Sequence, residues 1–174
     1  MIDRMTRAVQ AKPELYEEVE HNPSLTNEAY TIVGIVAVIA VIGGLLTNTF
    51  LEDRGLLDAV WSGVSVVGTY LLWSFLTYFV GTRFFGGTAT WGEMQRTLGY
   101  AMTPQLLSFI PCVGFLAALW SLYLGYVAVR QGLDVDTGNA LLTIVISFVL
   151  AFGAMMVLGI IFGVGAAGLD LITG

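Results

Sequence analysis

Residues 29–51 read AYTIVGIVAVIAVIGGLLTNTFL, a run without a formal charge. A helix needs about 20 predominantly apolar residues to cross a hydrocarbon core roughly 30 Å thick, so this run predicts a membrane-spanning helix. A second uncharged run covers 59–82, and charged residues separate it from the first. The sequence therefore predicts a first pair of spans over about 30–51 and 59–82.

The composition of the chain also points to a membrane protein. Of its 174 residues, 56 % are hydrophobic and 11 % are charged, whereas soluble domains carry about 25 % charged residues. Seven scattered basic residues against 13 acidic ones give a net charge of −6, which argues against a nucleic-acid binder. Cys112 is the one cysteine, so an internal disulfide and a cysteine-based zinc site are excluded. We expect Cys112 to be a small buried side chain.

A third uncharged run, 97–129, is too long for one span. A straight helix of that length would measure about 50 Å and would need more than the usual tilt. Pro104 and Pro111 divide the run, and Pro111 suits the first turn of a new helix, where its missing N–H costs nothing. We therefore expect two spans, over 91–109 and 111–129.

A helix start precedes the third run. Thr90 and Glu93 have the spacing of a capping box, which predicts a helix that begins near Trp91. The last uncharged run, 137–169, predicts a span over 139–162 followed by a loose, glycine-rich tail. The expected fold is an all-α, polytopic integral membrane protein, a five-transmembrane-helix bundle.

Basic residues set the expected orientation, because cytoplasmic loops are enriched in Lys and Arg. Five spans with the N-terminus inside place only Arg54 on the outer side. The inner side then holds Arg4, Arg7, Lys12, Arg83, Arg96 and Arg130. A four-span alternative moves Arg130 outside and fits the rule less well.

The chain divides into residues 1–29, a cytoplasmic amphipathic segment, and 30–174, the membrane domain. The N-terminal segment has no apolar stretch typical of a signal peptide. We expect a short helix on the inner leaflet and then a second small apolar stripe; the alternative is a frayed, solvated tail. The two stripes are Ile2, Met5 and Val9, and then Leu15, Tyr16 and Val19.

Catalytic or metal chemistry needs titratable groups that converge, and the sequence offers few. His21 is the one histidine and lies in the acidic N-terminal segment, where we expect a surface residue. We predict no enzyme, no metal and no cofactor. Gln105 is a candidate for a polar path through the membrane, because Pro104 frees a backbone carbonyl beside it. Gly159 and Gly163 form a helix-packing motif, either within the chain or between two copies.

Four charged residues near the expected inner face form a candidate docking patch for an acidic lipid or protein partner: Arg83, Glu93, Arg96 and Arg130. The alternative is the orientation signal plus an exposed ion pair, which stabilises little.

Three motifs in the middle of the chain resemble the signature of the Yip family of Ypt/Rab-interacting membrane proteins. They are Phe84-Phe85-Gly86-Gly87, then Trp91-Gly92-Glu93-Met94, then Leu98-Gly99-Tyr100-Ala101-Met102-Thr103-Pro104. The resemblance implies five spans with a cytoplasmic N-terminus, and structural roles for Gly86, Gly87, Gly99, Tyr100 and Pro104.

Eukaryotic members of that family are associated with Rab-type GTPases. Their Asp-Leu-Tyr-Gly-Pro motif has no counterpart before the first span here, which argues against GTPase binding and favours a prokaryotic-type member in a cytoplasmic membrane. The expected function is that of a non-enzymatic adaptor or organiser of membrane proteins or lipids. Two alternatives stay open: an accessory subunit of a larger complex or a homo-oligomer, and a small permease, channel or lipid-moving protein.

Overall fold

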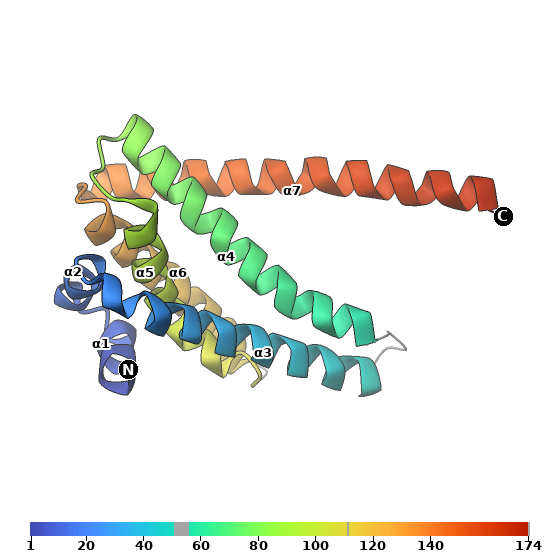
Figure 1. Cartoon of the computed structure of the whole chain (residues 1–174), viewed down its shortest axis with the longest axis horizontal. Helices are drawn as coiled ribbons and strands as arrows, with labels where there is room; N and C mark the ends of the chain where they lie inside the picture. The colour runs from blue at the N-terminus through green and yellow to red at the C-terminus, as the bar shows by residue number, and fades with distance from the viewer. Residues whose placement is uncertain (51–55, 111, 174) are drawn as a thin grey trace.

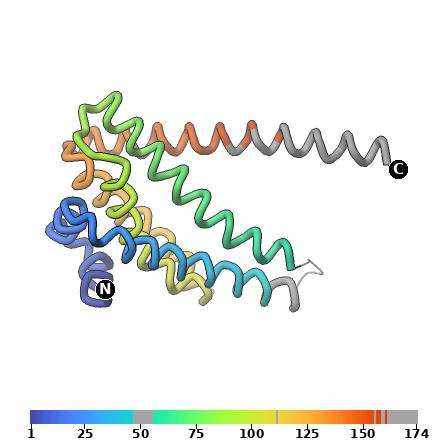
Figure 2. The backbone as a smooth tube through the Cα atoms, in the orientation of Figure 1, coloured from blue at the N-terminus to red at the C-terminus, as the bar shows by residue number. Residues whose placement is uncertain are grey.

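The computed structural model describes residues 1–50, 56–110 and 112–173; within these ranges the side chains of 47–50, 155, 158, 159 and 161–173 are not described. Figures 1 and 2 show the arrangement of the helices. In chain order, the described elements are α1 (Ile2–Val9), α2 (Pro13–Glu20), η1 (Pro23–Leu25), α3 (Thr26–Phe50), α4 (Leu56–Phe84), α5 (Trp91–Ala101), η2 (Thr103–Leu107), α6 (Val113–Gly132) and α7 (Thr137–Thr173).

Within the described residues, four helices are long and apolar enough to cross a membrane. These candidate spans are Pro23–Leu46, Leu56–Phe84, Val113–Gly132 and Thr137–Ala154, close to four of the five expected positions. Their outer surfaces carry large exposed apolar side chains such as Phe115, Leu122 and Phe148. Because such surfaces are favourable only in an apolar environment, the fold is that of an all-α integral membrane protein.

The fifth expected span, 91–109, is divided into two shorter helices. The capping box of Thr90 and Glu93 is confirmed and starts α5 at Trp91. The α-helix ends at Ala101 and gives way to the 3-10 helix η2. Pro104 explains this break, because proline lacks an N–H and disfavours α-helical backbone in the residue before it. Whether α5 and η2 together cross the membrane stays a prediction.

The helices α5 and α6 form an antiparallel hairpin whose two ends meet. The backbone N–H of Thr88, just before α5, donates to the Leu133 carbonyl, just after α6, at 3.1 Å. The Thr88 hydroxyl also donates to Oδ2 of Asp134 at 3.2 Å. Leu133 packs so closely on Gly81, near the end of α4, that a Cβ there would lie 2.3 Å from its Cδ1.

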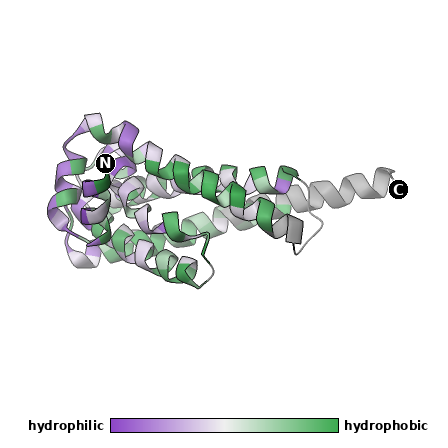
Figure 3. Cartoon of the chain, turned by 90° about the horizontal axis from the view of Figure 1, so that it is seen from below, coloured by the Kyte–Doolittle hydropathy of each residue, from purple (hydrophilic) through white to green (hydrophobic). Residues whose placement is uncertain are grey.

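We call this meeting point of α4, α5, α6 and α7 the polar end. Figure 3 shows that hydrophilic residues gather at this end of the molecule.

The first 25 residues fold against the membrane helices, and we call them the N-terminal cap. Leu15, Tyr16 and Val19 of α2 are buried in the main hydrophobic cluster, against α5 and α6. The second apolar stripe therefore packs inside the protein. In the first stripe, Ile2 and Val9 are exposed, whereas Met5 is partly buried against the main hydrophobic cluster; contact of α1 with the headgroups stays a prediction.

The turn between η2 and α6 corrects one prediction. Cys112 is exposed, not buried, and its backbone is left-handed, with φ at +66°. The residue lies directly before α6, where the hairpin reverses direction, so no neighbouring helix covers it. Pro111 and the loose tail after residue 162 lie outside the fully described residues.

Candidate functional site

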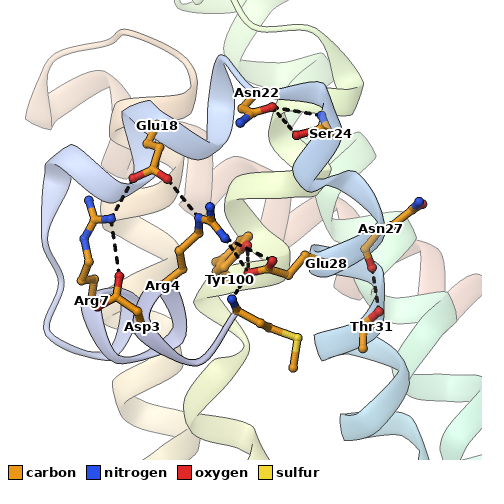
Figure 4. Close-up of polar contacts among 11 residues, drawn as sticks. Asp3, Arg4, Arg7, Glu18, Asn22, Ser24, Asn27, Glu28, Thr31 and Tyr100 are labelled. Atoms are coloured by element: carbon orange, nitrogen blue, oxygen red, sulfur yellow. Dashed lines mark hydrogen bonds and ion pairs between the residues drawn. The ribbon is translucent and has the colours of Figure 1, made fainter.

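A network of charged side chains ties the N-terminal cap to α3 and α5 (Figure 4). The Tyr100 hydroxyl donates to Oε1 of Glu28 at 2.5 Å, and Arg4 donates to Oε2 of the same carboxylate at 3.2 Å. Arg4 Nε and Arg7 Nη1 contact the two oxygens of Glu18 at 3.0 and 2.8 Å. These hydrogen bonds, first from Arg4 and then from Arg7, lower the pKa of Glu18. The network therefore joins α1, α2, α3 and α5, and Tyr100 anchors it to α5.

Arg96 of α5 holds the C-terminal end of α2. Its Nε donates to the Val19 carbonyl at 2.9 Å, Nη2 donates to the Glu20 carbonyl, and Nη1 reaches the Thr26 hydroxyl at 3.5 Å. The side chain is only 6 % exposed. The last carbonyls of a helix lack intrahelical donors and carry partial negative charge, so a buried guanidinium satisfies them without a carboxylate.

Glu20, at the same junction, carries a buried carboxyl group. Its Oε2 has no hydrogen-bond partner among the described residues. Burial raises its pKa from 4.5 to about 7, and the charge of Asp134 adds to the shift, with smaller contributions of the same sign from Glu93 and Glu17. His21 acts in the opposite direction. This carboxyl therefore changes charge near neutral pH within the cap.

The structure separates the four residues of the expected docking patch. All four lie at the polar end, but the Glu93 carboxylate accepts from the Thr90 N–H at 2.6 Å in the capping box, and Arg96 is buried as described. Arg83 and Arg130 are exposed, and neither has a hydrogen bond or ion pair among the described residues. Only these two arginines are available to a partner.

The motif glycines permit close contacts and one special backbone conformation. Gly86 has φ at +70°, a region that side chains rarely allow. A Cβ at Gly87 would lie 2.9 Å from Leu133, and one at Gly99 would lie 3.0 Å from the Cβ of Ala29 on α3. These glycines therefore fix how the hairpin sits against α3 and α4. The packing prediction for Gly159 and Gly163 lies outside the described side chains.

A cavity of about 470 Å³ lies between α4, α5, η2, α6 and α7. Gln105 lines it, half-buried, one residue after the buried Pro104. The Gln105 side chain has no hydrogen bond to any described residue. Leu122 and Phe148, which also line this space, are exposed, so the candidate for a polar path faces a cavity that opens between the helices to the outer surface.

Sequence reasoning missed most of the residues that hold the cap. Arg4, Glu18, Glu20 and Glu28 were not predicted as site residues, although the basic α1 and the acidic α2 offered a signal. Opposite charge on consecutive short helices favours their pairing. No pattern indicated that Arg96 bonds to carbonyls 76 and 77 residues earlier in the chain. Within the described residues, no group of three or more His, Cys, Asp or Glu could hold a metal ion.

Comparison with known proteins gives one finding about the family. The family model described as the Yip1 domain matches residues 11–160, which include the second helix of the cap, the polar end and most of α7. No curated protein and no solved structure matches the chain.

Proposed function

This chain belongs to the Yip family, and on that premise we propose that it is a non-enzymatic membrane adaptor that gathers other membrane proteins at its polar end. One observation carries the proposal: the N-terminal cap is fixed to the bundle by Arg96 and by the network around Tyr100. The polar end is thereby an ordered surface, and Arg83 and Arg130 stand exposed beside it. Exposed, unpaired arginines favour a partner with acidic groups, because guanidinium binds carboxylates in two-point contacts.

The adaptor proposal requires the polar end to face the cytoplasm, and we propose five spans with the N-terminus inside a prokaryotic cytoplasmic membrane. Two features support this topology. Arg83, Arg96 and Arg130 lie at the polar end, whereas Arg4 and Arg7 lie on α1, which contacts α5 and η2. Because α5 begins and α6 ends there, the hairpin crosses the membrane either twice or not at all. The number of membrane spans is then five, or three if only α3, α4 and α7 cross. The combined length of α5 and η2, roughly 26 Å, favours five spans.

Cys112 makes this topology directly testable, because it is the one cysteine in the sequence and is exposed at the tip of the hairpin. A membrane-impermeant maleimide added to intact cells should label the wild-type chain and leave Cys112→Ser unlabelled. Labelling that requires detergent, or that occurs only in inside-out vesicles, would contradict the five-span topology.

The docking surface is tested by capture of partners in mild detergent. Arg83→Ala/Arg130→Ala should lose acidic membrane-protein partners that the wild type retains. A matched control is Arg54→Ala, which removes one positive charge from the segment between α3 and α4. An unchanged set of partners in the double variant would remove the polar end from the proposal. A second copy of this chain as the principal captured protein would instead assign the surface to self-association.

A further inference from the structure

The cavity between α4, α5, η2, α6 and α7 has the chemistry of a binding site. Its volume of about 470 Å³ falls within the range of small-molecule pockets, roughly 300–1,000 Å³, which are mostly apolar with a few placed polar groups. None of the side chains that line it carries a formal charge. A charged ligand would therefore find no counter-ion there.

Several polar groups that line the cavity lack partners. The Ser121 hydroxyl of α6 has no hydrogen-bond partner in the part of the chain that the structure describes, and the residue is only 8 % exposed. Gln105, Ser65 and Thr69 also line the space, and their side chains have no hydrogen bond to any described residue. By contrast, Ser62 donates to the Ala40 and Ala59 carbonyls. Of these four residues, Ser121 is buried, Gln105 and Ser65 are half-buried and Thr69 is exposed. A buried polar group without a partner costs about 1–3 kcal/mol, so the Ser121 hydroxyl favours a partner from outside the chain.

Polar residues lie toward one end of the cavity, the end near the hairpin tip. Gln105 lies close to the hairpin tip, and Ser65 lies in the half of α4 that is remote from the polar end. Trp73, Ile144 and Phe148, which are apolar, line the part nearer the polar end. In the five-span topology, the polar part is then toward the outer leaflet and the apolar part toward the membrane interior. A lipid of the outer leaflet is oriented in the same way, with its polar head outward and its alkyl chains toward the membrane interior.

We propose that the cavity binds a neutral amphiphile: a lipid with an uncharged hydroxyl or ester head, held by Gln105 and Ser65, whose alkyl chain lies past Ser121 along Trp73 and Phe148. The amide of Gln105 both donates and accepts hydrogen bonds, so it matches a hydroxyl or an ester. This site is separate from the polar-end surface of the adaptor proposal.

Two glycines provide a matched pair of variants. A Cβ at Gly125 and one at Gly68 would each meet nothing within 4 Å, so both positions have room for a side chain. Gly125 lines the cavity and Gly68 does not. Gly125→Phe should therefore fill the apolar part of the cavity, whereas Gly68→Phe adds the same side chain to a transmembrane helix elsewhere.

The probe is a diacylglycerol with a photoreactive diazirine on its acyl chain and an alkyne tag, mixed into phosphatidylcholine vesicles that contain the full chain. We expect saturable labelling of peptides from α5 and α6, lost in Gly125→Phe and kept in Gly68→Phe. Gln105→Leu should weaken labelling about 3- to 10-fold, the loss of one or two hydrogen bonds. Unlabelled diacylglycerol should compete, and phosphatidic acid with the same chains should not.

Equal labelling of the two glycine variants would overturn the proposal, because the probe would then report only general contact with lipid. Equal competition by phosphatidic acid would overturn the assignment of an uncharged head. A circular dichroism spectrum of each variant checks that the helices are intact.

Discussion

Arg96→Met should release the N-terminal cap from the bundle. Methionine keeps an apolar side chain of similar length but removes the donors to the Val19 and Glu20 carbonyls. A buried acceptor left without a donor costs about 1–3 kcal/mol. The Val19 carbonyl keeps one long hydrogen bond, from the Asn22 N–H at 3.4 Å. Methionine also avoids the desolvation cost of a buried charge, which offsets part of the lost free energy of docking. We therefore expect docking of α2 to weaken by about 3 kcal/mol, an increase of roughly 100-fold in the opening equilibrium.

Hydrogen exchange of the full chain in detergent micelles measures this opening. The amides of α2 should exchange faster in Arg96→Met by about that factor, while those of α4 stay protected. Arg130→Met is the control, since that arginine is exposed and has no partner among the described residues. Unchanged exchange of α2 in Arg96→Met, or an equal effect of the control, would refute the assignment of Arg96 as the residue that holds the cap.

Three further predictions concern neighbouring groups. Because burial in the folded cap raises the pKa of Glu20 from 4.5 to about 7, the contribution of this carboxyl to docking should fall by up to about 3 kcal/mol as the pH rises from 4.5 to 7. Glu18, whose pKa is lowered in the folded cap, should weaken docking at still lower pH, where it becomes protonated. Hydrogen exchange of the α2 amides between pH 5.5 and 7.5, taken relative to the intrinsic rate at each pH, should show the Glu20 effect in the wild type and no such change in Glu20→Gln. Tyr100→Phe should lower the free energy of unfolding, measured by thermal denaturation, by about 1.5–3 kcal/mol, because its hydroxyl donates to the Glu28 carboxylate. The control Tyr30→Phe loses a hydrogen bond to a neutral amide and should cost less. Equal losses in the two variants would show that the charge of Glu28 does not strengthen the bond. Gly99→Val should cost about 1–3 kcal/mol through overpacking against α3; unchanged thermal stability would mean that the two helices can move apart freely.

Much of the membrane fold was predictable because hydrophobic length is a local property. Four expected spans correspond to long apolar helices, and the capping box located the first residue of α5. The end of α5 was harder to predict. Apolar composition continues past Ala101, whereas the backbone responds to Pro104.

The candidate site was less predictable because its contacts join distant parts of the chain. The sequence indicated Tyr100 as a residue of the motif, but its partner Glu28 lies 72 positions away. The positive-inside pattern treats every arginine alike, so it could not distinguish the buried Arg96 from the exposed Arg83 and Arg130. Which arginine is buried depends on where α2 docks, and a single sequence does not encode that position in any short pattern.

The long separation between Arg96 and the carbonyls that it binds has a consequence for biosynthesis. The helices α1 and α2 leave the ribosome before α5 and α6, which form the surface that receives them. Until those helices enter the bilayer, the nascent cap has neither the guanidinium nor the tyrosine hydroxyl that fixes it. The cap is thus synthesised before the helices that hold it, and it can dock only after α5 and α6 have been made.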